Sequence, residues 1–355
     1  MTIKQRNKKK KTGKLLIGLT IILGVFAIVG LMGLKYYKWI FSDNINLSDK
    51  QAEFLYIPTH STFEDLQTIL DENELLLNKK SFEWVATIKK FNTVKPGRYQ
   101  IKEGMSNNTL INLLRSGKQT PVKVTFNNIR TKQELAGTIS HYIEADSISL
   151  LESLNDPVLL SELGVNSETI LSLFLPNTYE LWWNTTAEKF IKRMNAEYQK
   201  FWDDEKTAKA KALSLTPKQV SILAAIVDEE TIKPDEKPMV AGLYLNRLKK
   251  NIRLQADPTV KYALGDFSIQ RILTKDLEIN SPYNTYKYGG LPPGPIRIPS
   301  ISGINAVLNH TKHDYLYMCA KEDFSGYHNF AKTLKQHNQN AAKFQKALNK
   351  RKIYR

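Results

Sequence analysis

An uninterrupted apolar run near the N-terminus constrains this chain more than any other feature. No charged residue occurs from Leu15 to Leu34. At about 1.5 Å per helical residue, a run of this length spans roughly 30 Å, which is the thickness of the hydrocarbon core of a membrane. Backbone polar groups inside lipid must be satisfied within the segment, so a single run of this kind crosses as a helix. We therefore predict a transmembrane helix over 15–34.

The residues on either side of this run predict its orientation. The segment 1–14 carries seven basic residues, and the positive-inside rule keeps such a tail in the cytoplasm. Tyr36, Tyr37 and Trp39 would lie at the exit interface. A cleaved signal peptide is the alternative, but the run is long for one and no clear small-residue cleavage site precedes Lys35. The expected location is the cytoplasmic (inner) membrane, single-pass, with the remaining chain outside.

Charge and cysteine content fit that location. The formal net charge is +16, of which the tail supplies seven, leaving +9 for the remainder. This excess favours anionic wall polymers or lipid head groups, and an outside location removes nucleic acid as a partner. The single cysteine excludes an intrachain disulfide, so the fold must depend on its core.

The rest of the chain divides by pattern into a linker and two α+β parts. Residues 35–50 are expected to be a linker that is polar from Asp43. The segment 51–120 alternates strand and helix patterns, as in a small α+β module. The segment 121–355 is expected to form a larger α+β domain, with a strand at Val122–Phe126, a buried strand at Tyr315–Ala320 and a basic amphipathic helix from Asn340 to Arg355.

A helix beginning after Thr216 carries the first candidate site residue. Thr216, Pro217 and Gln219 combine a capping threonine, a proline at the first position and a glutamine three residues after the cap. At about 100° per residue, the apolar side chains from 220 to 227 share one sector and Glu230 falls in its middle. Asp228 falls at the edge of that sector and Glu229 on a solvated flank.

A carboxyl group held against apolar surface keeps its proton to higher pH, which is the property of a general acid at neutral pH. This makes Glu230 the candidate catalytic acid. The alternative is an ion pair between Glu230 and Arg247 or Arg253.

Two segments after this helix predict a binding surface. RLQADPTVKYALG places polar side chains around a proline, and SPYNTYKYGGLPPGPIRIPS is too rich in Pro and Gly for a regular helix or a central strand. Tyrosine faces with neighbouring amide and hydroxyl groups suit a sugar ring, although a Pro-rich loop that only covers the core is the alternative. The candidate substrate-binding residues are Gln255, Asp257, Thr259, Tyr283, Asn284, Thr285 and Tyr286.

Four late histidines raise the question of a metal. The spacings of His310, His313, His328 and His337 match no common zinc pattern, and Cys319 is the only cysteine. We predict no metal and no cofactor, and expect His328 to help close the binding cleft.

Several motifs in one order carry a family resemblance. IVDEET, NRL, LQADPTVKYALG, YNTYKYGGLPPGP and HNFAKTLKQHN resemble the endolytic murein transglycosylases, the MltG or YceG-like family. KPGRYQIKEGMSNNTLINLLRSGK resembles the small LysM-like module of that family. The resemblance implies an α+β catalytic domain over 121–355, a LysM-like module over 51–120 and no cofactor.

The resemblance also implies an activity and partners. These enzymes cleave the β-1,4 bond between N-acetylmuramic acid and N-acetylglucosamine within nascent glycan strands of peptidoglycan, leaving 1,6-anhydro ends and so terminating or trimming strand elongation. One glutamate is catalytic, and the motif position selects Glu230, as the helical phase does. The implied partners are peptidoglycan strands, the membrane and cell-wall synthesis proteins.

Two departures from the family pattern and two alternative functions remain. Asn177 stands where the family commonly has Asp, and Ser300 where it commonly has Gly. The chain could be an inactive membrane-anchored peptidoglycan-binding scaffold, or a hydrolase with Asp257 or Asp266 as a second carboxylate. On the transglycosylase interpretation, replacing Asp228 or Glu229 by its amide should leave much of the activity.

Overall fold

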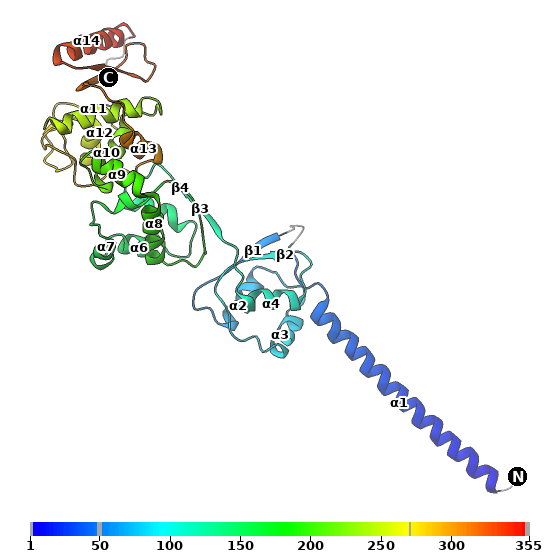
Figure 1. Cartoon of the computed structure of the whole chain (residues 1–355). Coiled ribbons are helices and arrows are strands. Elements are labelled where there is room, and N and C mark those ends of the chain that lie inside the picture. Colours follow the sequence, from blue (N-terminus) through cyan, green and yellow to red (C-terminus); the bar gives the residue numbers. More distant parts are fainter. Residues whose placement is uncertain (1–2, 48–51, 270, 352–355) are drawn as a thin grey trace. The chain divides into compact units, whose positions relative to one another are not determined.

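The computed structural model describes residues 3–47, 52–269 and 271–351, and side chains from residue 14 onward. The chain forms two compact units. Unit 1 contains the chain up to Pro121 together with Trp182–Asn184, and unit 2 contains Val122–Leu181 and Thr185–Arg355 (Figure 1). Each unit has its own strands and helices, so the fold is a mixture of α and β structure, as predicted.

Unit 1 begins with α1 (Ile3–Phe41), one unbroken helix that contains the whole apolar run. Its side chains from Leu15 to Leu34 are exposed, and the stretch Lys14–Phe41 is long and apolar enough to cross a membrane. At its C-terminal end, the Asn107 side chain donates a hydrogen bond to the backbone oxygen of Trp39 (2.9 Å). That bond satisfies one of the carbonyls that every helix end leaves without a partner.

The rest of unit 1 is a two-stranded antiparallel sheet with three helices. Strand β1 (Ala52–Ile57) pairs with β2 (Gly97–Lys102), and α2 (Phe63–Glu72), α3 (Lys79–Ile88) and α4 (Asn107–Ser116) pack around them. Each helix starts at a side-chain cap, supplied by Thr62, Asn78 and Ser106, which is why the chain turns where it does.

The segment that follows Asp43, expected to be a polar linker, is instead part of this core as far as residue 47. Asn44, Ile45 and Leu47 are buried, and Asn44 donates a hydrogen bond to Asn107 (2.7 Å). Residues 48–51 lie outside the described part of the chain. The apolar side chains at 45 and 47 therefore extend the core of unit 1 back to the end of α1.

Unit 2 begins with a strand that pairs with a second strand distant in the sequence. Strand β3 (Val122–Phe126) pairs antiparallel with β4 (Asn177–Leu181). Between them lie α5 (Lys132–Ser140), α6 (Ser147–Ser153), α7 (Pro157–Glu162) and the short 3-10 helix η1 (Ile170–Leu173). After β4 come α8 (Ala187–Phe201) and α9 (Asp204–Ala212).

The centre of unit 2 is α10 (Pro217–Glu230), which packs against α11 (Lys237–Lys249), α12 (Asp257–Leu264) and α13 (Ile301–Leu308). The predicted start is confirmed, because Thr216 and Gln219 form a capping box and Pro217 is the first helical residue. The short 3-10 helix η2 (Asp276–Glu278) follows α12. Every residue from Val220 to Asp228 is buried, so α10 is covered on all sides.

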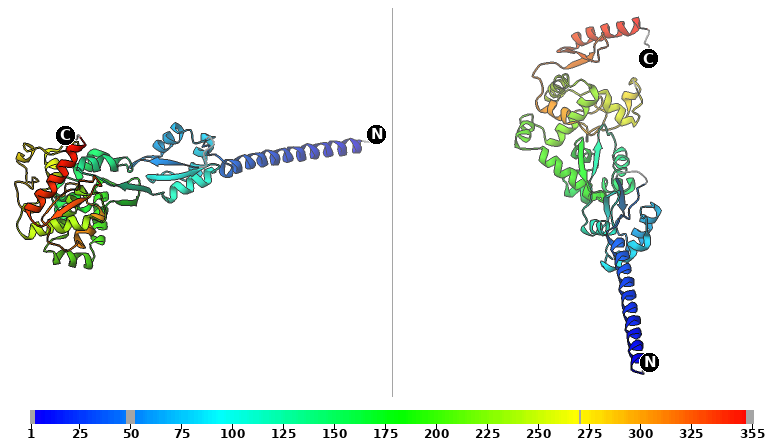
Figure 2. Two further views of the ribbon diagram at one scale, coloured as in Figure 1. Left: turned by 90° about the horizontal axis from the view of Figure 1, so that it is seen from above. Right: turned by 90° about the vertical axis from the view of Figure 1, so that its right-hand side faces the viewer.

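A second small sheet follows near the C-terminus. Strands β5 (Tyr317–Ala320) and β6 (His328–Ala331) are antiparallel, and α14 (Leu334–Lys350) packs on them (Figure 2). The prediction of a buried strand here is wrong in one respect, because all four residues of β5 are only half-buried. One face of this sheet is open to a pocket, described below. The tail beyond 351 lies outside the described residues.

Candidate functional site

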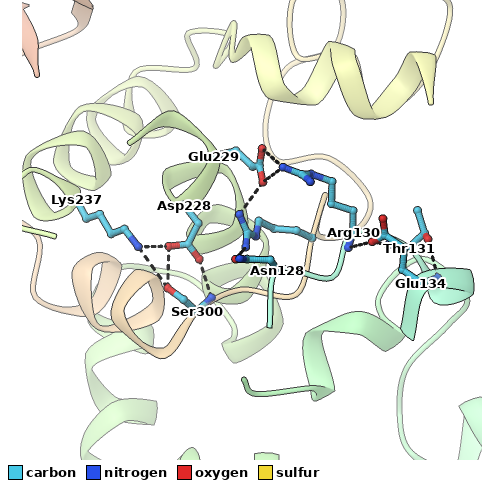
Figure 3. A network of polar contacts seen from close by, with 9 residues as sticks. Asn128, Arg130, Thr131, Glu134, Asp228, Glu229, Lys237 and Ser300 are labelled. Carbon is cyan, nitrogen blue, oxygen red and sulfur yellow. Dashed lines mark hydrogen bonds and ion pairs between the residues drawn. The ribbon is translucent and has the colours of Figure 1, made fainter. Parts of the chain in front are cut away.

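The three acids at the end of α10 point into three different environments. Because α10 is surrounded by other elements, each successive side chain meets a different neighbour. Figure 3 shows Asp228 directed toward α11 and α13, and Glu229 toward the segment after β3. The helical phase placed only Glu230 on the core side, and the structure corrects this.

Asp228 is the most buried of the three. One of its carboxylate oxygens accepts a bond from Lys237 Nζ (2.6 Å), and the other from the backbone N–H of Ser300 (2.6 Å). The Ser300 hydroxyl donates to Asp228 as well (2.8 Å) and also caps α13 through the N–H of Gly303. Asp228 therefore holds α10, α11 and α13 together. The serine that departs from the family pattern is part of this network.

Glu229 is not on a solvated flank, contrary to the phase prediction. Its carboxylate accepts two bonds from Arg130 (3.0 and 3.1 Å) and one from Arg297 (2.7 Å). Arg297 in turn donates to the Asn128 side chain (2.5 Å). The charge of Glu229 is matched by two guanidinium groups, and the pairs tie α10 to the segment after β3 (Figure 3).

Glu230 ends α10 in a different way. The Tyr244 hydroxyl on α11 donates a hydrogen bond to Glu230 Oε1 (2.6 Å), and no ion pair among the described residues includes Glu230. The alternative prediction, an ion pair between Glu230 and Arg247 or Arg253, is therefore wrong.

The surroundings of Glu230 favour its protonated form. Burial raises the pKa of this carboxyl to about 7, and the charges of Asp257 and Glu229 add to the rise, while the Tyr244 hydrogen bond and Lys261 oppose it. Its place at the C-terminal end of a helix acts in the same direction as burial. Glu230 can thus hold a proton at neutral pH and give it up at a pH close to neutral.

Glu230 opens into a pocket of about 380 Å³. Four of the predicted substrate-binding residues line this pocket with it, namely Gln255, Asp257, Tyr286 and His328. Chain segments that are far apart in sequence form its walls: the ends of α10 and α12, the Pro-rich loop, and the second small sheet. The structure therefore brings together the acid and half of the predicted binding residues.

Hydrogen bonds fix the polar side chains of the pocket. The Tyr286 hydroxyl donates to Asp257 Oδ1 (2.5 Å), and an Arg247 guanidinium N–H donates to Gln255 Oε1. Arg247 is itself buried and also donates to the backbone oxygens of Arg253 (2.9 Å) and Leu316 (2.8 Å). A single arginine thus ties the loop before α12 to the strand that forms the opposite wall.

His328 is held on the second sheet by Glu236. Its backbone N–H donates to Glu236 Oε1 (2.7 Å), and its Nδ1 lies 2.9 Å from Glu236 Oε2. Glu236 is buried beside the start of α11. A proton on Nδ1 would be shared with this carboxylate, which leaves Nε2 as the second hydrogen-bonding atom of the ring.

The remaining predicted residues support the loops rather than line the pocket. Thr259 and Thr285 are buried and share a hydrogen bond (2.8 Å), and the buried Asn284 donates to the backbone oxygens of Leu277 and Ile279 (both 2.9 Å). Tyr283 packs against Tyr262. Residues 257–264 form α12, so the predicted binding loop is short, while the Pro-rich run 281–300 is irregular as predicted.

Several pocket residues had no assigned role in the sequence. These are Tyr244, Arg247, Tyr317, Cys319 and His337. Arg247 lies in the NRL motif and was considered only as a partner of Glu230. Tyr317 and His337 come from the second sheet and α14, and nothing local in the sequence shows that these segments return to α10. In the described ranges, no group of three or more His, Cys, Asp or Glu side chains is arranged to hold a metal ion.

Comparison with known proteins decides the family. Residues 55–343 match the model of the YceG-like family. This chain belongs to the YceG-like family. Every pocket residue named above lies within the matched range.

Relatives of this YceG-like protein include curated proteins and a solved structure. It is 30% identical over 325 residues to the endolytic murein transglycosylase of Bacillus subtilis, with 86% of this chain and 89% of that one covered. It is 26% identical to the endolytic murein transglycosylase of Streptococcus pneumoniae, covering 92% of this chain but only 64% of that longer protein. A crystal structure of a YceG-like protein from Listeria monocytogenes is 28% identical, with a TM-score of 0.54 over 82% of this chain and 99% of that one.

Proposed function

We propose that this YceG-like protein is a lytic transglycosylase that cleaves peptidoglycan strands internally. The observation that carries the proposal is a proton-holding carboxyl, Glu230, at the wall of a polar pocket. The relatives named endolytic murein transglycosylases support the same reaction. The bond cleaved would be the β-1,4 link between N-acetylmuramic acid and N-acetylglucosamine.

One carboxyl can perform both proton transfers of this reaction. Glu230, protonated near neutral pH, gives its proton to the glycosidic oxygen as the bond to the anomeric carbon breaks. The resulting carboxylate then accepts the proton of the C6 hydroxyl of the same muramic acid, whose oxygen attacks the anomeric carbon. No water is consumed, the product carries a 1,6-anhydro end, and Glu230 regains its proton.

The other pocket groups would orient the sugar for this intramolecular attack. An attack within one ring depends on geometry more than on nucleophile strength. Gln255, Asp257 and Tyr286 are each held by a hydrogen bond to a protein partner, so they present fixed positions to the substrate. The carboxylate of Asp257 would also stabilise positive charge that develops at the anomeric carbon. His328 would contact the sugar from the opposite wall.

The apolar helix α1 would anchor the enzyme in the cytoplasmic membrane. Its basic flank favours a cytoplasmic N-terminus and an extracytoplasmic catalytic domain. In this orientation the catalytic domain faces the compartment that holds newly made strands, where cleavage would end or trim their elongation together with wall-synthesis proteins. We assign the small module, residues 51–120, a LysM-like role in presenting the strand.

A two-carboxylate hydrolase is the second candidate, because Asp257 lines the same pocket as Glu230. The other carboxylate considered for this role, Asp266, instead accepts bonds from the side chain and backbone of Ser268. A hydrolase would add water at the anomeric carbon and leave a reducing end. The products therefore distinguish the two reactions.

The test is a digest of purified peptidoglycan by the full chain in detergent, with new ends identified by mass spectrometry. We expect internal 1,6-anhydro ends, each lighter by one water than a hydrolysed end. Replacing Glu230 by Gln should lower the rate by about 10²- to 10⁴-fold. Glu229→Gln is the matched control, since that neighbouring carboxylate faces arginines and not the pocket. Reducing ends would establish a hydrolase, and no cleavage by the folded chain would favour the scaffold.

A further inference from the structure

Unit 1 begins at a defined level above the membrane. The apolar run over 15–34 is as long as the hydrocarbon core is thick, at about 1.5 Å per residue and roughly 30 Å. The hydrocarbon boundary therefore falls next to Lys35. Helix α1 continues without a break to Phe41, so its last residues rise through the headgroup layer, which is roughly 5–8 Å thick on each side.

Aromatic contacts fix α3 beside this part of α1. The ring of Tyr36 stacks on Trp84 of α3 with centroids 4.4 Å apart, and Trp39 meets the same ring at 5.6 Å. Residues 36–39 lie on the order of 3–8 Å beyond Leu34 along the helix axis. The Trp84 ring is therefore at the level of the lipid headgroups, and α3 lies beside the C-terminal end of α1 (Figure 1).

The side chains at this level suit an anionic lipid surface. On α3, Lys80 and Ile88 lie one turn before and one turn after Trp84, on the same side of the helix. Ile88 is 60% exposed. Lys35 and Lys38 on α1 are also exposed. Within the ranges that the structure describes, no ion pair includes any of these three lysines.

Two acids close to this surface are engaged by other side chains, and the exposed Asp43, just beyond the end of α1, has its carboxylate beside Gly104. Asp71 is paired with Lys79 at the start of α3. Glu83 accepts a hydrogen bond from Gln67 of α2 (3.1 Å). Three ammonium groups that form no ion pair among the described residues thus accompany the exposed isoleucine here. One of them, that of Lys35, lies 4.8 Å from the centroid of the Trp39 ring.

We propose that this membrane-proximal face, made of Lys35, Lys38, Lys80, Trp84 and Ile88, binds anionic phospholipid headgroups. The proposal rests on the membrane anchor described under the proposed function. It gives the small module a second role, because α3 fixes the module against the lipid surface. Any glycan bound by unit 1 must then use another face.

The test places a fluorescent label at position 88 of the full chain in phospholipid vesicles. The label is attached to Ile88→Cys in a Cys319→Ser background, and lipids spin-labelled at the headgroup quench it. Vesicles of phosphatidylcholine are compared with vesicles that contain one quarter phosphatidylglycerol. Labels at Tyr37→Cys, on α1, and at Lys118→Cys, beyond the far end of α4, mark the interface and the solvent.

We expect the label at 88 to be quenched nearly as strongly as that at 37 and at least threefold more than that at 118. Phosphatidylglycerol should increase the quenching at 88, and Lys80→Gln or high salt should reverse the increase, whereas Lys118→Gln should not. Quenching at 37 with none at 88 would overturn the proposal while leaving the anchor intact. A response to phosphatidylglycerol that Lys80→Gln leaves unchanged would also overturn it, and an unquenched label at 37 would remove the anchor itself.

Discussion

At the scale of single residues, the protonation of Glu230 links the sequence to the chemistry. Its neighbours Asp228 and Glu229 are neutralised by Lys237 and by two arginines, whereas Glu230 receives only a tyrosine hydroxyl. Of the three acids, it alone combines burial with the absence of a cationic partner. Its raised pKa follows from that difference.

Replacing Glu230 by Gln should stabilise the protein at alkaline pH while greatly lowering its activity. The folded pKa is about 7 and the ordinary value 4.5, so between these pH values the folded chain binds more protons than the unfolded chain and loses stability as pH rises. Above about pH 7, burying the ionised carboxylate lowers the free energy of unfolding by roughly 3 kcal/mol, at 1.36 kcal/mol per pKa unit. The loss is smaller where pocket water solvates the charge. Thermal melts should show a variant more stable by a few degrees at pH 8 and equal to the wild type at pH 4. A variant of equal stability at both pH values would contradict the buried environment.

Replacing Tyr244 by Phe should move the pH dependence of the rate. The hydroxyl favours the charged form of Glu230, so its loss raises the pKa of the carboxyl further. If the protonated carboxyl starts the reaction, the fall in rate on the alkaline side should shift to higher pH by up to about one pH unit. A profile of kcat/KM against pH measures this. If instead the rise in rate on the acid side moved to higher pH and the alkaline side stayed unchanged, Glu230 would act first as a base.

At the scale of elements, α10 organises the site because it is buried on all sides. Helices α11, α12 and α13 and the segment after β3 each contact one of its flanks. Gly303 of α13 approaches it closely, and a Cβ at this position would come within 2.5 Å of Asp228 Oδ1. The buried carboxylate of Asp228 thus occupies space that only glycine leaves open.

Replacing Asp228 by Asn should destabilise unit 2, and this revises the sequence-based expectation that such a variant keeps its activity. The change leaves the ammonium group of Lys237 buried without a counter-charge, a loss of roughly 3–5 kcal/mol in comparable buried pairs. Chemical denaturation measures the cost, and the double variant with Lys237→Met should recover part of it. A single variant as stable as the wild type would show that the ion pair does not hold α10 to α11.

At the scale of the whole molecule, the chain begins with the apolar helix α1 and then passes between its two units more than once. Trp182–Asn184 returns from unit 2 to unit 1, where Gln119 donates to the Asn184 side chain (3.2 Å) and Trp183 packs on Tyr56. Unit 1 is therefore incomplete in a fragment that stops at Pro121. A fragment prepared with the apolar helix should therefore include both units.

The proposed orientation predicts a simple proteolysis pattern. A protease added to intact spheroplasts should degrade everything beyond α1, because both units face outside, and should leave an N-terminal fragment of roughly 40 residues detectable by a tag at Met1. Inside-out vesicles should give the converse, with the tag removed and the remaining chain protected. Protection of the catalytic domain in spheroplasts would show that the orientation is the opposite of the proposed one.

Much of the local structure follows from short-range sequence. The apolar run predicts α1, the cap at Thr216 predicts where α10 begins, and the density of Pro and Gly predicts the irregular run 281–300. Each of these depends on interactions within a few residues, such as the bond from Gln219 N–H to Thr216. The motif order likewise identified the family and, through it, Glu230 as the candidate acid.

The tertiary structure alone decided which side chains share the pocket and which acid is free to hold a proton. Helical phase separates a buried face from a solvated one, but α10 has no solvated face, so phase could not show that Asp228 and Glu229 are paired. Arg247 meets Leu316, and His328 meets the end of α10, only because segments some 70 to 100 residues apart pack together. The sequence determines each of these segments locally, and the packing between them determines the charge that Glu230 carries.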